Sequence, residues 1–116
     1  MAAEPPTPEK FCLYFKSGTT QLNDDSLLLL PEILASIHKR QSCDISVNGH
    51  TDRVGSEAYN QDLSLRRALR VQALLIEAGI NPAFLSTASH GEGNPLVHTS
   101  DNVAEPRNRR VETIIR

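Results

Sequence analysis

An acidic and a basic side chain lie fifteen positions apart in the middle of this chain. Asp52 closes the motif Gly49-His50-Thr51-Asp52, and Arg67 lies in Leu63-Ser64-Leu65-Arg66-Arg67-Ala68, about two turns into the helix expected after Asn60. A carboxylate and a guanidinium on two elements joined by a short loop suit a ligand that carries an ammonium and a carboxylate on one carbon. Asn60 precedes Arg67 by seven residues, so both lie on one helix face.

Two regular elements must position this pair. Residues 44–49 alternate between polar and apolar side chains, which is typical of a strand with one buried face. Apolar residues then recur at helical spacing as far as Ala78, which predicts a helix that begins at Ser56 or at Asn60. Gly79 is the candidate left-handed residue that ends this helix.

The other elements complete an alternating pattern. Residues 11–15 are apolar and aromatic and predict a first strand. Residues 27–37 have helical spacing and predict a helix that ends near Arg40. Pro31 either kinks this helix or begins a main helix after a separate turn, and the unbroken apolar stripe favours the kink. A weak strand at 85–89, a loop at 90–95 and a last strand at 111–115 follow, so we expect a two-layer α/β sandwich.

The bulk composition indicates one small globular domain. The chain has 116 residues and a net charge of −2, which weakens any interpretation as a nucleic-acid binder. Its longest apolar run, Leu27 to Leu30, is far too short to span a bilayer. Residues 1–10 are rich in proline and read as a linker, so we expect a domain at 11–116 that was cut from a longer protein.

The cysteines and histidines raise two further possibilities. Cys12 and Cys43 either form a disulfide or are two small buried residues, one in each of two strands. Two cysteines carry no spacing pattern, so both alternatives stay open. His50 lies two positions from Asp52, but the other histidines are too distant for usual zinc spacing. We therefore predict no metal and no cofactor.

Simpler interpretations exist for both charged residues. Asp52 fits an Asx-turn in a loop. Arg67 fits a solvated helix cation paired with Asp62 or with Asp52 itself. Arg66 is the nearest competitor for the role of Arg67, but helical geometry places it about 100° away around the axis.

The motifs together resemble the OmpA-like peptidoglycan-binding domain. That family includes the C-terminal domain of outer-membrane protein A, the peptidoglycan-associated lipoprotein and the stator protein MotB. The resemblance covers roughly residues 11–116, and its strength lies in the order and spacing of the motifs. The matching segments are Phe15 with Leu22, Gly49 to Asp52, Gly55-Ser56, Tyr59-Asn60, Leu63 to Val71, Gly79-Ile80, Gly91-Glu92 with Pro95, and Asn108 to Glu112.

The resemblance implies a fold, a ligand and a site. The fold is β-α-β-α-β-β, with a mixed sheet and both main helices on one face. The ligand is the peptidoglycan stem peptide, held through meso-diaminopimelate between Asp52 and Arg67. The loop at 17–21 forms one wall, and Asn108 to Arg110 lie close by, although spacing does not decide which of the two arginines faces the site. The expected ligand-binding residues are Asp52, Arg67, Asn60, Thr51, Leu63 and Arg110.

The implied function is a non-catalytic module that anchors an envelope protein to the cell wall. The resemblance places it in the periplasm of a Gram-negative bacterium, tethered to a membrane through the rest of its parent protein. A wall hydrolase is the first alternative, but a glycosidase needs two carboxylates across one cleft, and Arg67 would keep Asp52 ionised. A protein-interaction domain that has lost the ligand is the second. We expect Asp52→Ala and Arg67→Ala each to abolish wall binding and to leave the fold intact.

Overall fold

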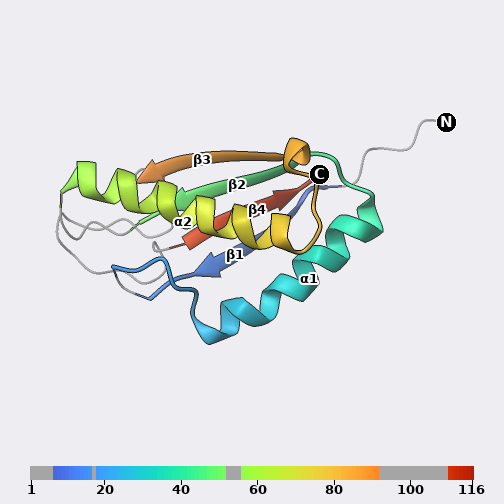
Figure 1. Ribbon diagram of the computed structural model, residues 1–116, viewed down its shortest axis with the longest axis horizontal. Helices are drawn as coiled ribbons and strands as arrows, with labels where there is room; N and C mark the ends of the chain where they lie inside the picture. Colours follow the sequence, from blue (N-terminus) through green and yellow to red (C-terminus); the bar gives the residue numbers. More distant parts are fainter. Residues whose placement is uncertain (1–6, 17, 52–55, 92–109) are drawn as a thin grey trace.

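The chain folds as a four-stranded sheet with two long helices on one face (Figure 1). The computed structural model describes residues 7–16, 18–51, 56–91 and 110–116, and the side chains of His90 and Gly91 are not described. This order of elements confirms the predicted β-α-β-α-β-β architecture. The elements are β1 (Glu9–Tyr14), α1 (Asp24–Arg40), β2 (Ile45–His50), α2 (Glu57–Glu77), the short 3-10 helix η1 (Pro82–Phe84), β3 (Leu85–Gly91) and β4 (Arg110–Ile115).

The sheet is mixed, in the order β1-β4-β2-β3. The last strand, β4, lies between β1 and β2 and is antiparallel to both, whereas β2 and β3 are parallel. A parallel pair needs a crossover, and α2 supplies it between β2 and β3. Because β4 pairs Val111 with both Leu13 and Gly49, the ends of β1 and β2 lie beside the start of β4.

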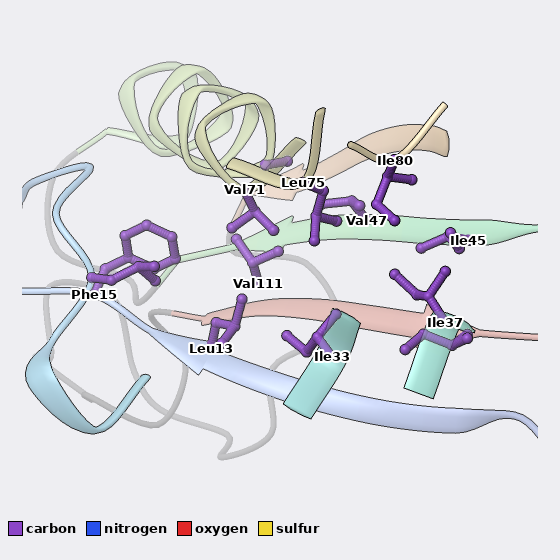
Figure 2. Close-up of a cluster of buried hydrophobic side chains, with 13 residues drawn as sticks. Leu13, Phe15, Ile33, Ile37, Ile45, Val47, Val71, Leu75, Ile80 and Val111 are labelled. Atoms are coloured by element: carbon purple, nitrogen blue, oxygen red, sulfur yellow. The ribbon is translucent and has the colours of Figure 1, made fainter. Parts of the chain in front are cut away.

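The hydrophobic core lies between the helices and the sheet. Figure 2 shows side chains of the central strands meeting those of the two helices. In α1 the contributing positions Ile33 and Ile37 are four apart, and in α2 Val71 and Leu75 are four apart, as one helix face requires. The fully buried apolar side chains are Leu13, Ile33, Ile45, Val47, Ala68, Val71, Val111 and Ile115.

Helix α1 begins and ends where its sequence favours it. The side chain of Asn23 accepts a hydrogen bond from Ser26 N at 2.9 Å, which satisfies one free amide of the first turn. Gln41 follows the helix in a left-handed conformation, with a φ of 49°. Pro31 lies inside this single helix, so the alternative of a separate turn before it is wrong.

Ser56 is the N-cap of helix α2, which confirms the earlier of the two predicted starting positions. The Ser56 hydroxyl accepts from Tyr59 N at 3.1 Å. At the other end Gly79 has a φ of 102°, and Ile80 N donates to Leu75 O at 3.0 Å. These contacts form a Schellman ending and confirm the predicted role of Gly79. Neither helix has the length and apolar character needed to cross a membrane, within the part of the chain described.

Three expectations about the remaining segments need correction. Strand β1 begins at Glu9, inside the segment expected to be linker. Strand β3 continues to Gly91, beyond the predicted end, because its parallel pairing with β2 extends to His50 opposite Gly91. Cys12 is half-buried and Cys43 is exposed, and both are free thiols, so neither cysteine alternative holds in full. Burial, followed by the charge of Glu112, raises the pKa of the Cys12 thiol.

Candidate functional site

The candidate residues that the structure describes lie at one end of the sheet. Strands β1 and β2 end there, β4 begins there, and the N-terminal part of α2 lies beside them, at the left in Figure 1. Tyr14, the last residue of β1, pairs with Arg110, the first residue of β4. His50 ends β2 at the same edge, and Thr51 follows it.

One face of α2 is buried at this end. Asn60, Leu63 and Arg67 follow each other at spacings of three and four, and their exposed fractions are 1%, 5% and 0%. The spacing places them on one helical stripe, as the sequence predicted for Asn60 and Arg67. Burial of the polar side chains of Asn60 and Arg67 costs free energy unless they are hydrogen-bonded. The hydrogen-bond partners of these side chains therefore indicate what role they have.

Gly49 sets the distance between β2 and this helix. A Cβ atom at Gly49 would lie 2.0 Å from the backbone carbonyl oxygen of Ser64 and 3.3 Å from the Cβ of Ala68. Only glycine permits such an approach between strand and helix. The approach brings the buried stripe of α2 close to the end of β2.

Arg67 is the largest fully buried side chain of the described chain. Its Nε donates to the carbonyl oxygen of Thr19 at 2.8 Å, and its Nη2 donates to that of Lys16 at 3.3 Å. The guanidinium carbon lies 5.1 Å from the centre of the Phe15 ring, within cation–π range. The guanidinium therefore joins α2 to the loop that follows β1.

The sequence left open whether Arg67 is exposed to solvent and whether it pairs with Asp62, and these contacts answer both questions. Arg67 is not a solvated cation, and Asp62 pairs instead with the exposed Arg66, whose Nε lies 2.8 Å from Asp62 Oδ2. The exposure of Arg66 beside the buried Arg67 agrees with the predicted angle of about 100° between them around the helix axis. The expectation that Arg67→Ala leaves the fold intact does not fit these contacts, because the substitution removes two buried charge-assisted hydrogen bonds.

Arg110 is also buried at this end, with 2% of its surface exposed. Its Nε and Nη2 both lie 2.9 Å from Oε1 of Glu112, the residue two positions along the same strand face. His50 Nε2 lies 3.9 Å from the same oxygen, and Lys10 Nζ lies 3.8 Å from Oε2. Glu112 was not among the predicted site residues, although its period-two spacing from Arg110 on a strand places both side chains on one face.

The surroundings of Glu112 favour its ionised form. Burial by itself raises the pKa of Glu112. The hydrogen bond and the charge of Arg110 act in the opposite direction, followed by the charges of Lys10 and His50, and the net effect lowers this pKa below its ordinary value of 4.5. Glu112 therefore holds Arg110 as a carboxylate at neutral pH.

The rest of the predicted site is described only in part. Thr51 is 2% exposed, and its Oγ1 has no hydrogen-bond partner in the described part of the structure. Asp52, Asn108 and Arg109 lie outside the described residues, so the predicted pairing of Asp52 with Arg67 stays a prediction. A separate hollow of about 760 Å³ lies between β1 and α1, and none of the candidate residues lines it.

The fold defines the class of this protein: a two-layer α/β domain with a mixed four-stranded sheet and two helices on one face. Within that class, the chain belongs to the OmpA family, whose sequence profile matches residues 14–109. Membership confirms the expectation that the chain is not an enzyme.

Three relatives illustrate the match. An outer membrane protein of Gluconacetobacter diazotrophicus is 35% identical over 117 residues, which cover 95% of this chain and 31% of that protein. The peptidoglycan-associated lipoprotein of Burkholderia pseudomallei has a TM-score of 0.79 at 25% identity, covering 90% of this chain and 89% of that one. The C-terminal domain of Helicobacter pylori MotB has a TM-score of 0.73 at 31% identity, covering 91% and 84%. This chain thus spans about a third of the length of the first relative.

Proposed function

We propose that this chain is a non-catalytic module that binds peptidoglycan and anchors an envelope protein to the cell wall. The observation that carries the proposal is the fully buried guanidinium of Arg67 on α2, which the loop after β1 holds, in a chain of the OmpA family. A relative of the same fold is named as a peptidoglycan-associated lipoprotein. The ligand that suits this end of the sheet is the meso-diaminopimelate of the stem peptide.

The chemistry of diaminopimelate supports this choice. Its distal carbon carries one ammonium and one carboxylate. Asp52 accepts from the ammonium, while Arg67 donates to the carboxylate through a planar group whose geometry matches it. Each charge-assisted hydrogen bond contributes on the order of 1.5–3 kcal/mol at a partly dry site.

The remaining candidate residues complete the proposed site. Asn60 and Thr51 contribute buried polar groups, and the Thr51 hydroxyl, without a partner among the described residues, is suited to a ligand atom. Leu63 forms an apolar wall. Arg110 adds a second cation, which Glu112 holds in a fixed orientation.

The family supports a place in the cell envelope. Relatives are named as outer membrane and peptidoglycan-associated proteins. We therefore place this domain in the periplasm of a Gram-negative bacterium, joined to a membrane through the rest of its parent protein. A protein-interaction domain that has lost the ligand is the alternative that the binding experiment addresses.

The test is calorimetric titration with a stem peptide that carries meso-diaminopimelate, together with pull-down on wall sacculi. A peptide with L-lysine at the same position is the matched ligand, because it differs by the distal carboxylate. Saturable binding of the diaminopimelate peptide, and at least about tenfold weaker binding of the lysine peptide, are expected, since a factor of ten corresponds to the loss of about 1.4 kcal/mol.

Two matched variants test the residue that carries the proposal. Arg67→Lys keeps a positive charge but cannot form the planar fork, so binding is expected to be lost. Arg66→Lys changes the neighbouring exposed arginine, and it is expected to bind like the parent. Equal binding by a folded Arg67→Lys variant would overturn the clamp. Absence of binding to both peptides and to sacculi would favour the protein-interaction alternative.

A further inference from the structure

The loop after β1 is a closed, internally bonded unit. An antiparallel bridge between Phe15 and Leu22 closes its base. Above this bridge, Lys16 N donates to Gln21 O at 3.0 Å. Gly18 has a φ of 70°, a left-handed conformation that glycine adopts without strain. These contacts connect the described residues on the two sides of the loop, Lys16 and residues 18–21.

Thr19 ties the two sides of this loop together. Its hydroxyl donates to Lys16 O at 2.9 Å and accepts from Gln21 N at 3.2 Å. Its backbone N also donates to Lys16 O, at 3.1 Å. One side-chain oxygen thus connects the first and the last residues of the loop, while no described contact joins it to Arg67.

Two carbonyl groups of this loop hold Arg67, and the Thr19 hydroxyl bonds directly to one of them, that of Lys16. The carbonyl oxygens of Thr19 and Lys16 accept from Nε and Nη2 of Arg67. Two acceptors along one side of a planar guanidinium fix both its position and its rotation. The Phe15 ring, 5.1 Å away, limits movement on one side of that plane.

We infer that Thr19 is a positioning residue for the ligand-binding guanidinium. It acts through the loop: its hydroxyl donates to the Lys16 carbonyl oxygen and accepts from Gln21 N. These two bonds hold the Lys16 carbonyl and the backbone on either side of Thr19, so that the carbonyl oxygens of Lys16 and Thr19 orient Arg67. The inference rests on the proposed function, since it assumes that Arg67 receives the ligand carboxylate. The family resemblance implies only that this loop forms one wall of the site, and it gives no role to Thr19.

The expected effect follows from the directionality of these bonds. A bidentate pair with a carboxylate requires the guanidinium plane to be aligned in advance. Thr19→Val keeps the shape of the side chain but removes the donor and the acceptor that tie the loop. We expect the affinity of this variant for the diaminopimelate peptide to fall about tenfold, with the fold retained, because neither lost bond lies in the core.

The chain offers matched controls for this experiment. Thr19→Ser retains the hydroxyl and is expected to bind like the parent. Thr20→Val removes the hydroxyl of the next residue, which is also half-buried and makes no side-chain hydrogen bond in the described part of the chain. Thr19→Ala serves as a second variant without the hydroxyl if Thr19→Val does not fold.

A second measurement does not depend on the ligand. In ligand-free protein, nitrogen-15 NMR reports the exchange of the Arg67 Nε–H with water. This exchange is slow while the group donates to Thr19 O, and it is expected to be at least about fivefold faster in Thr19→Val than in Thr19→Ser or Thr20→Val.

The two readouts separate the possible failures. Unchanged Nε–H exchange in Thr19→Val overturns the positioning role, whatever the affinity. Faster exchange together with unchanged affinity overturns the link from Thr19 to binding. If the parent itself does not bind the peptide, the proposed function fails, and the exchange rate alone then supports or overturns the effect of Thr19 on Arg67.

Discussion

Replacing Gly49 by alanine tests the contact on which the geometry of the site depends. Gly49 lies in β2, directly beneath α2, and its φ is not in the left-handed region. Alanine is therefore compatible with the backbone conformation at this position. Any loss of stability reports the close approach of strand and helix rather than backbone strain.

The size of the effect can be worked out from the contact distances. The new Cβ would lie 2.0 Å from Ser64 O, whereas ordinary contact begins at 3.4 Å, so the two backbones must separate by about 1.4 Å. No change of rotamer relieves the clash, because the nearest atoms are backbone. Overpacking of a core costs about 1–3 kcal/mol, and we expect a value of about 3 kcal/mol for this rigid contact.

The assay is urea unfolding of Gly49→Ala beside Asn48→Ala, a half-buried position one residue earlier in the same strand. Only the first variant is expected to lose about 3 kcal/mol. Since α2 carries Asn60 and Arg67, the shift should also change their NMR signals and weaken binding. A Gly49→Ala variant with parental stability and an unchanged α2 would refute the reasoning.

Two further substitutions have effects of defined sign. Thr113 is fully buried, and its Oγ1 has no hydrogen-bond partner in the described residues. Thr113→Val should therefore raise the free energy of unfolding by about 1 kcal/mol. A loss of stability in this variant would contradict the prediction. Because the folded state lowers the pKa of Glu112, its contribution to stability is complete above about pH 4.5 and is lost as the pH falls through the folded pKa. Urea unfolding at several pH values should therefore show a weaker acid dependence in Glu112→Gln than in the parent, and equal dependence would exclude this contribution.

Much of the fold follows from local patterns in the sequence. Period-two alternation located β2, and helical spacing located both helices. Cap residues fixed the ends more closely: Ser56 is the N-cap of α2, and Gly79 is the left-handed residue just after its C-cap. The stripe that joins Asn60 to Arg67 was also predictable, because it depends only on the 3.6-residue repeat of a helix.

The missing parts of the site depend on contacts between distant segments. Thr19 and Lys16 are 48 and 51 positions from Arg67, and no local pattern pairs them. The end of β3 was misjudged for a similar reason, because pairing with β2 extends a strand through residues that locally favour a loop. Glu112 differs, since its spacing from Arg110 was visible and only its importance was missed.

The buried position of Arg67 links stability to binding in this domain. A guanidinium removed from water requires fixed acceptors, and the loop carbonyls of Lys16 and Thr19 provide two of them. The same acceptors restrict the orientation of the guanidinium. Because the Arg67 side chain is already ordered in the folded protein, it loses little further conformational entropy when it binds a carboxylate. Gly49 determines how closely α2 approaches the sheet. Thr19 holds the loop whose carbonyl groups bind the Arg67 guanidinium. A change at either residue should therefore act on affinity through Arg67, even though neither needs to touch the ligand.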